Sequence, residues 1–397
     1  MRPLGSLVLA AALAALPAAP AWAAPPPAPA TPAAADPDFS PAPSADSSAI
    51  LDAARAKVAA GDTKGAIDGL AAYVGAHPAD AAAGRLLGDL YFRVPDYQKA
   101  EKVWKAVLVL APGDRETHSR LGALYAATDR VDASIAEFQQ SLPNRNGYAG
   151  LIMAHKKAGD LGAYLTKLEY DAQKNPFDVS RWTDLGQARR AMRQFDAAYE
   201  AFNRVVGIRP ASCAARVDLA YVLVDLKRVD DAIGHLKSCL QNDAYYYPAV
   251  VNLGEAYLEK DDPATARPYL DRALSLRPEG NEALVDIGYI YDLQGDWKTA
   301  VAYYNRAIRS DPLRPEAYID LGYDYNQHRF FPLAEAAFLK GISVASDDGR
   351  LHYLLAVTYS SQGKISLARS EFSHASASEL PEVARAAKRE LALLPPV

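Results

Sequence analysis

The sequence has few of the residues from which redox, metal and catalytic sites are built. Its 397 residues include two cysteines and seven histidines, and the histidines are scattered along the chain. It contains no His-Glu-x-x-His motif, no glycine-rich phosphate loop and no Gly-x-Ser-x-Gly nucleophile turn. We therefore expect a protein that is not an enzyme and that has no cofactor and no metal site.

Positive charge is also scarce. The chain carries 43 lysines and arginines against 48 aspartates and glutamates, a formal net charge of −5. A general nucleic-acid binder needs a basic face for the phosphates, so we expect no nucleic-acid partner. Beyond the first residues no apolar run approaches the roughly 18 residues of a membrane-spanning helix. We expect no membrane span in the mature chain.

Residues 1–23 have the pattern of a cleavable signal peptide. Arg2 precedes an apolar run, Leu4 to Leu16, and Ala21-Trp22-Ala23 is a small-x-small cleavage site. Gly5 and Ser6 interrupt the run, which is too short to cross a hydrocarbon layer of about 30 Å. The pattern predicts a periplasmic or secreted protein, and the lack of a following cysteine counts against a lipid anchor.

Residues 24–46 form a linker that is rich in proline and alanine. They contain eight prolines and almost no large apolar side chains, so they cannot bury enough surface to offset the entropy of ordering. We expect this segment to be a disordered spacer. A proline-rich ligand for another protein is the alternative.

A pattern with a period of 34 residues fills the rest of the chain. Leu253, Gly254, Tyr257, Ala266, Leu270, Ala273 and Pro278 return 34 positions later as Ile287, Gly288, Tyr291, Ala300, Tyr304, Ala307 and Pro312. The pattern gives ten units over residues 47–382, weak at 47–80 and 115–178, which begin near Ser47, Ala81, Arg115, Arg145, Val179, Cys213, Tyr247, Asn281, Pro315 and Gly349. Four residues are missing between the third and fourth units, so we expect a flexible joint around residues 141–150.

Each unit is predicted to be a helical hairpin. Apolar residues three and four apart put one stripe on each helix. Gly254 and Gly288 shorten the distance at which two helices cross, and Pro278 and Pro312 end the second helix. This small-residue and aromatic code at period 34 resembles that of the tetratricopeptide repeat (TPR) family.

The resemblance implies an all-α fold, a right-handed α-solenoid of about ten helix-turn-helix repeats whose first helices line the concave side. The ends of such a stack need covers. Residues 383–397 fit a C-terminal capping helix and tail, begun by Pro381, with an inner stripe of Val383, Ala387 and Leu391.

Cys213 and Cys239 occupy positions 1 and 27 of one repeat. In an antiparallel hairpin that turns near position 14, these positions lie side by side. Together with export, this favours a disulfide bond. The alternative is two buried thiols.

By resemblance to the family, positions 2, 5, 9, 12 and 13 of each first helix face the groove. The early repeats place a basic group there: Arg85, Arg93, Lys156, Lys157 and Arg190. The later repeats place tyrosines, acids and one amide there: Tyr221, Asp225, Glu255, Glu259, Tyr289, Asp292, Tyr323, Asn326 and Tyr353. Aromatic faces beside carboxylates suit a basic peptide or a sugar polymer. Alternatively, the tyrosines pack on neighbouring helices and the charges form a solvated face.

These observations favour a non-catalytic periplasmic scaffold whose groove binds a protein partner in the bacterial envelope. The alternative is a polysaccharide-binding accessory protein of exopolysaccharide synthesis or export, because exported members of the family serve there. A third hypothesis is envelope assembly around division or pilus complexes.

Overall fold

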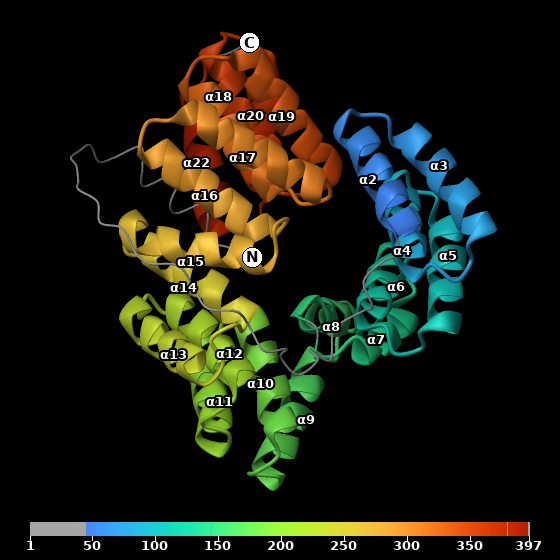
Figure 1. Cartoon of the computed structure of the whole chain (residues 1–397), viewed down its shortest axis with the longest axis vertical. Coiled ribbons are helices and arrows are strands. Elements are labelled where there is room, and N and C mark those ends of the chain that lie inside the picture. Colours follow the sequence, from blue (N-terminus) through green and yellow to red (C-terminus); the bar gives the residue numbers. More distant parts are fainter. Residues whose placement is uncertain (1–44, 144, 379, 396–397) are drawn as a thin grey trace. The chain divides into compact units, whose positions relative to one another are not determined.

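A computed structural model of the chain describes residues 45–143, 145–378 and 380–395 (Figure 1). Every regular element in these ranges is a helix, and the twenty-one helices are labelled α2 to α22. The all-α prediction is confirmed. The predicted signal peptide, residues 1–23, and nearly all of the predicted linker, residues 24–46, lie outside the described ranges. No described helix is both long and apolar enough to span a membrane.

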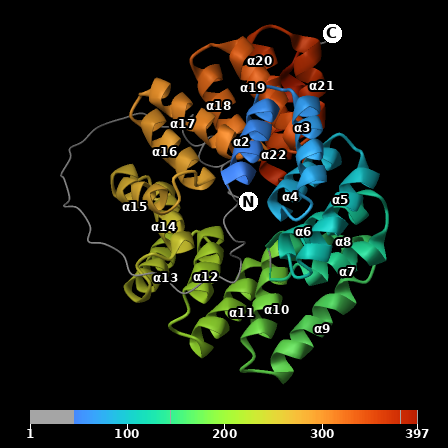
Figure 2. The ribbon, with the colours of Figure 1, turned by 45° about the vertical axis from the view of Figure 1, so that its right-hand side comes forward.

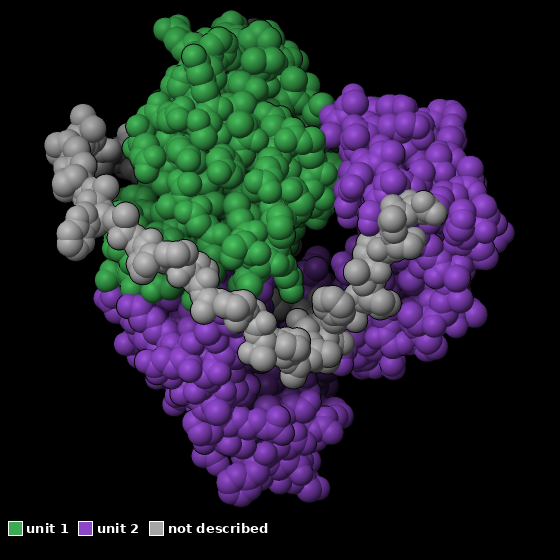
Figure 3. Space-filling model, viewed as in Figure 1, with its two compact units in different colours: residues 1–35, 257–397 green, residues 36–256 purple. Residues whose placement is uncertain are grey.

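The helices fall into two compact units, and the boundary between them lies inside α14 (Tyr247–Glu259) (Figure 3). The helices of unit 2 before α14 are α2 (Ala45–Ala59), α3 (Thr63–Ala76), α4 (Ala81–Arg93), α5 (Tyr97–Leu110), α6 (Arg115–Ala127), α7 (Val131–Gln140), α8 (Arg145–Ala158), α9 (Leu161–Lys174), α10 (Val179–Ala191), α11 (Phe195–Ile208), α12 (Cys213–Asp225) and α13 (Val229–Asn242). The helices of unit 1 after α14 are α15 (Pro263–Leu276), α16 (Asn281–Leu293), α17 (Trp297–Ser310), α18 (Glu316–Gln327), α19 (Phe331–Val344), α20 (Gly349–Ser361), α21 (Ile365–Ala375) and α22 (Pro381–Leu393).

The helices begin where the 34-residue period predicts. Eight of the ten first helices start at the predicted residue, α18 starts one residue later at Glu316, and α2 starts earlier, at Ala45. Within each unit a first helix packs against the second helix that follows it, as α4 does on α5 and α16 on α17 (Figure 2). The chain is therefore a series of helical hairpins, as the sequence indicates.

Aspartates start many of these helices. The side chains of Asp80, Asp114, Asp178 and Asp348 accept hydrogen bonds from backbone N–H groups in the first turn of the helix that follows each of them. Such caps satisfy donors that have no partner inside the helix. Part of the acidic composition is thus structural.

A second device satisfies backbone carbonyls in the same turns between repeats. The fourth residue of several repeats places a side-chain nitrogen or hydroxyl within hydrogen-bond distance of the carbonyl six residues earlier, in the turn that precedes the helix. These pairs are His118 and Pro112, Trp182 and Pro176, Arg216 and Pro210, Tyr318 and Pro312, and His352 and Ser346. Different side chains perform the same task because each can donate at that distance.

The glycine at position 8 is required by an aromatic ring from the second helix. A Cβ atom on Gly288 would lie 2.6 Å from the Tyr304 ring, and one on Gly322 would lie 2.5 Å from the Phe338 ring. Gly88 and Gly186 stand in the same relation to Trp104 and Phe202. The aromatic side chain therefore occupies the volume that the missing Cβ leaves at the helix crossing.

We expect Gly288→Leu to lower the free energy of unfolding by about 1–3 kcal/mol, because Tyr304 is itself fully buried and cannot move aside. Gly207→Leu in α11 is the matched control. A Cβ there meets nothing within 4 Å, so replacing this exposed helical glycine should be neutral or slightly stabilising. Urea unfolding measures both. A Gly288→Leu protein as stable as the control would contradict the crossing model.

The shortened junction between the third and fourth repeats is packed. The Phe138 ring lies over both Gly122 and Gly150, where an added Cβ would come within 2.7 and 2.3 Å of it. Phe138 forms a buried cluster with Leu151 and Ala154, and α7 packs on α8. The boundary between the compact units lies inside α14 and not at residues 141–150. A ring between two glycines packs the shortened junction, and the flexibility of residues 141–150 stays a prediction.

The first helices of successive repeats contact one another within each unit. In unit 2, α4 contacts α6 and α6 contacts α8, and in unit 1, α16 contacts α18 and α18 contacts α20. Comparable packing between successive second helices is not found in the described part of the chain. The first helices are thus closer together than the second helices, as expected if they line the inner face of the stack.

The last helix covers the end of unit 1 as predicted. In α22 the side chains of Val383 and Ala387 are buried, and Leu391 packs on the same cluster. Arg385, Lys388 and Arg389 are exposed on the opposite face. The helix therefore shields the apolar face of the last hairpin from water.

Candidate binding faces of the first helices

The clearest cluster of predicted groove residues lies on α16 and α18 of unit 1. Tyr289 and Asp292 on α16 and Tyr323 and Asn326 on α18 are all half-buried. Burial raises the pKa of Tyr289 to about 12, with smaller contributions from Asp261 and Asp320, so its hydroxyl remains a neutral hydrogen-bond donor. The structure thus brings these four predicted residues onto two adjacent first helices.

Two carboxyl groups on these helices, those of Asp292 and Asp324, form a hydrogen bond with each other. Asp324 on α18 is 3% exposed, and it interacts with Asp292 on α16. Asp292 Oδ2 accepts a hydrogen bond of 2.7 Å from the hydroxyl of the buried Tyr304. Asp292 Oδ1 and Asp324 Oδ2 are buried and receive no hydrogen bond from a donor in the described residues. We call Asp292 and Asp324 the carboxyl pair.

The protein environment opposes ionisation of the carboxyl pair. Burial, followed by the charge of Asp324, raises the pKa of Asp292 to about 7, although the hydrogen bond from Tyr304 works in the other direction. Burial likewise raises the pKa of Asp324 to about 6. His328 Nε2 lies 3.3 Å from Asp324 Oδ1 at the exposed edge of the pair. Two buried carboxylates side by side favour a proton or a cation between them.

The carboxyl pair should make the stability of the protein fall as the pH rises. Both groups have a higher pKa in the folded than in the unfolded state, so the folded protein holds more protons between about pH 4 and 7. We expect the free energy of unfolding of Asp292→Asn to exceed that of the unmodified protein by about 1–2 kcal/mol at pH 8. At pH 4.5 the two proteins should differ little. Urea unfolding at both pH values measures this, with Asp347→Asn, an exposed aspartate, as control. Equal urea-unfolding curves for Asp292→Asn and Asp347→Asn at pH 8 would show that the carboxyl pair does not lower the stability.

In unit 2 the predicted groove residues pair with one another. Arg190 Nε on α10 lies 2.7 Å from Asp225 Oδ2 on α12, and its guanidinium lies 5.4 Å from the centre of the Tyr221 ring. These three predicted residues therefore form one contact between adjacent first helices.

The predicted basic group is largely neutralised. Arg85 Nη1 lies 2.5 Å from Asp114 Oδ2, and Lys157 Nζ lies 2.6 Å from Asp129 Oδ1. With Arg190, three of the five predicted cations are bound to carboxylates of a neighbouring repeat or turn. Arg93 is half-buried and Lys156 is exposed. The structure therefore shows ion pairs that link repeats where the sequence suggested a basic wall.

One of the remaining predicted residues serves packing. Tyr353 on α20 contacts the edge of the Phe372 ring, with 5.6 Å between ring centres, which supports the packing alternative for this tyrosine. Glu255 and Glu259 are half-buried on α14.

Sequence reasoning missed Asp320 and Asp324, because positions 6 and 10 were not counted as groove positions. Burial, followed by the charges of Asp320 and the carboxyl pair, raises the pKa of Tyr304, so Asp320 belongs to the same cluster. A signal was present: aspartate recurs at position 6 of four repeats, at Asp184, Asp218, Asp286 and Asp320. These aspartates are buried or half-buried, and an acid repeated at such a position indicates a polar contact between repeats.

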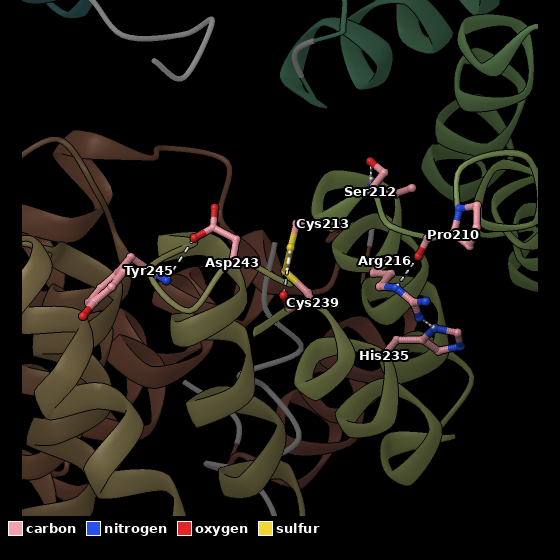
Figure 4. The surroundings of a disulfide bond; sticks show 9 residues. Pro210, Ser212, Cys213, Arg216, His235, Cys239, Asp243 and Tyr245 are labelled. Atoms are coloured by element: carbon pink, nitrogen blue, oxygen red, sulfur yellow. Dashed lines mark hydrogen bonds between the residues drawn. A yellow bond between two sulfur atoms is a disulfide. The ribbon is translucent and has the colours of Figure 1, made fainter. Parts of the chain in front are cut away.

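Cys213 at the start of α12 and Cys239 in α13 form a disulfide bond, with 4.8 Å between their Cα atoms (Figure 4). Cys239 is fully buried. One turn further along α12, Arg216 donates to the carbonyl of Pro210 and contacts His235 on α13. The bond therefore joins the start of the first helix of repeat six to the end of its second.

Comparison with known proteins agrees with the hairpin architecture. The tetratricopeptide repeat model matches residues 51–115, 85–149, 183–247 and 251–315, and no curated protein matches. A tetratricopeptide repeat protein from Parabacteroides merdae is 17% identical over 62% of this chain and 98% of its own, with a TM-score of 0.52. The APC/C hetero-tetramer Cut9-Hcn1 matches at 15% identity over 85% of this chain and 82% of that one, with a TM-score of 0.49. MamA matches at 26% identity over 41% of this chain and 95% of its own, with a TM-score of 0.35.

The chain belongs to the tetratricopeptide repeat family. Repeats of this kind are typical of protein-interaction scaffolds, and such proteins are typically non-catalytic.

Proposed function

We propose that this protein is an exported scaffold of the bacterial envelope that binds a basic segment of a partner protein on the first helices of unit 1. The observation that carries the proposal is the carboxyl pair, with two half-buried tyrosines beside it. The signal-peptide pattern of residues 1–23 supports export.

A lysine or arginine side chain fits the chemistry of this face. The carboxyl pair carries less than its full negative charge at neutral pH because its environment raises both pKa values. A cationic side chain could take the place of the shared proton and provide donors to the two oxygens that lack them. The rings of Tyr289 and Tyr323 offer contact area for the alkyl part of such a side chain.

The ion pairs of unit 2 also support a basic partner. Arg85, Lys157 and Arg190 are each bound to a carboxylate, so that surface offers little unpaired positive charge to an acidic ligand. Unit 1, in contrast, has buried acids on α16 and α18, among them Asp286, Asp320 and Asp324. A basic segment is therefore a better fit than an acidic one.

Polysaccharide binding, in an accessory role in exopolysaccharide synthesis or export, is the second candidate. It is favoured by the half-exposed rings of Tyr289 and Tyr323 on adjacent first helices, because aromatic faces stack on sugar rings. A glycan array tests it. Binding that is lost in a Tyr289→Ala, Tyr323→Ala double variant but kept in Asp292→Asn would select this candidate.

An oligolysine peptide is a suitable probe for the leading proposal. We expect its affinity, measured by calorimetry, to rise between pH 5.5 and 8 and to fall at least about tenfold in Asp292→Asn. Asp347→Asn removes the same charge from an exposed site, so it separates binding at the carboxyl pair from attraction to an acidic protein. Equal loss in the two variants, or no dependence on pH, would overturn the proposal.

The proposed location has its own test. Cell fractionation should recover the protein outside the cytoplasm, with a mature start near residue 24, and deletion of residues 1–23 should retain it inside. Recovery of uncleaved protein in the cytoplasm would contradict export.

A further inference from the structure

The last hairpin of unit 1 brings together three side chains that bind metals in other proteins. His352 lies on α20, and Glu371 and His374 lie one turn apart on α21. One ligand atom of each lies within 4.8 Å of the others. The side chains of His352 and Glu371 are 11% and 19% exposed, and that of His374 is 62% exposed. The sequence alone gave no reason to expect a metal site, because His352 and His374 are 22 residues apart.

The backbone fixes which nitrogen of His352 faces this group. Nε2 lies 2.9 Å from the carbonyl oxygen of Ser346, which can only accept a hydrogen bond. Nε2 therefore carries a hydrogen, and Nδ1 faces Glu371 Oε2 at 2.6 Å. Metal-binding histidines are commonly oriented in this way, with the second ring nitrogen donating to a carbonyl.

An equivalent arrangement in the third repeat shows which part of this geometry is structural. His118 Nε2 lies 2.9 Å from the carbonyl of Pro112, and Nδ1 lies 2.7 Å from Glu137 Oε2. The residue three positions after Glu137, where the last repeat has His374, is Gln140. The histidine–glutamate pair is thus a contact between the helices of a hairpin that recurs in the chain. Only the last repeat adds a second histidine.

We propose that His352 Nδ1, a carboxylate oxygen of Glu371 and a ring nitrogen of His374 bind a divalent transition-metal ion of the Zn²⁺ type. Two imidazoles and one carboxylate are a ligand set that Zn²⁺ accepts, whereas Mg²⁺ and Ca²⁺ prefer oxygen ligands alone. Three protein ligands leave at least one coordination position open. The site lies on α20 and α21, apart from the carboxyl pair on α16 and α18.

The distances require a modest adjustment that the site allows. Ligands of a tetrahedral Zn²⁺ lie about 3.3 Å apart, because each is about 2.0–2.1 Å from the metal. His352 Nδ1 and Glu371 Oε2 are now 2.6 Å apart and must move away from each other. His374 Nδ1 is 3.9 Å from Glu371 Oε2 and must move closer to it. The exposed His374 side chain can turn without disturbing the core. The metal would lie between His352 Nδ1 and Glu371 Oε2, where the two atoms now contact each other directly.

Calorimetric titration of the full-length, untagged chain with Zn²⁺ tests the proposal. We expect one site per chain whose affinity falls at least about tenfold in His374→Ala, and which is unchanged in His118→Ala. His374 is exposed, so circular dichroism should show the variant to be folded.

The third repeat allows a gain-of-function test. Gln140→His places a second histidine beside the His118–Glu137 pair, at the position that corresponds to His374 in the last repeat. Gln140 is exposed. We expect this variant to bind a second Zn²⁺ ion. The proposal is wrong if the unmodified chain does not bind Zn²⁺, or if His374→Ala binds it as tightly as the unmodified chain. Neither result depends on binding of a basic peptide, so this proposal and the proposed function can fail separately.

Discussion

Phe338→Ala is expected to lower the free energy of unfolding by about 3–5 kcal/mol, the largest single effect that we predict. Phe338 on α19 has no exposed surface and lies over Gly322 of α18. It belongs to a buried cluster that continues through Leu351 and Leu355 of α20 to Phe372 of α21. Removing the ring therefore leaves a cavity between two hairpins, and not only within one.

The site cannot collapse easily around this cavity. The floor is a glycine backbone with no side chain to fill the space, and the neighbouring Ala334 is also small. Because each repeat of a solenoid is stabilised mainly by its neighbours, the loss should also weaken α20 and α21. Hydrogen exchange should show faster opening of these helices, whereas the helices of unit 2 should be affected least.

Leu339→Ala, one residue further along α19, is the matched control. Leu339 is 46% exposed, so its truncation should cost well under 1 kcal/mol in urea unfolding. Similar losses for the two variants would mean that the aromatic ring at position 24 of the repeat does not carry the packing between hairpins.

The fold could be predicted because it repeats. Gly288 and Gly322, with Tyr304 and Phe338 sixteen residues later, occur at the same positions of consecutive units, and each copy confirms the phase of the others. That phase predicts where the helices start, where the capping helix begins at Pro381, and which residue is the partner of Cys213. The period is thus sufficient to place backbone elements and apolar contacts.

The candidate sites could be predicted only in part, because polar contacts depend on which side chain of a neighbouring repeat is within reach. Tyr289, Asp292 and Tyr323 were found from family groove positions, but their partner Asp324 was not. Arg190 was expected to face a ligand and instead reaches Asp225, 35 residues away. A repeat pattern predicts which positions face a neighbouring repeat. It does not predict which long, oppositely charged side chains of adjacent repeats will pair with each other.

The polar group on the last hairpin has the same explanation. His352 and Glu371 are 19 residues apart, as are His118 and Glu137, and this recurrence would have revealed the pair. His374 has no counterpart in the third repeat, so repetition could not predict it. Features that differ between repeats are the ones that periodicity cannot supply.

Loss of the Cys213–Cys239 bond is expected to lower the free energy of unfolding by about 3 kcal/mol. The bond spans 26 residues, and closing a loop of this length restricts the unfolded chain by about that amount in the chain-entropy model. It also joins the first turn of α12 to the last turns of α13, so repeat six cannot open without moving both helices. The effect should appear on reduction as well as on mutation.

A Cys213→Ala, Cys239→Ala double variant isolates the cross-link from packing. Position 27 is alanine in the next two repeats, at Ala273 and Ala307, and both are fully buried, so alanine fits where Cys239 lies. In urea unfolding, dithiothreitol should destabilise the unmodified protein to the level of the variant and leave the variant unchanged. If the reduced and oxidised proteins unfold at the same urea concentration, repeat six is held by its apolar contacts alone, as its neighbours are, and the bond adds nothing to the stability of the stack.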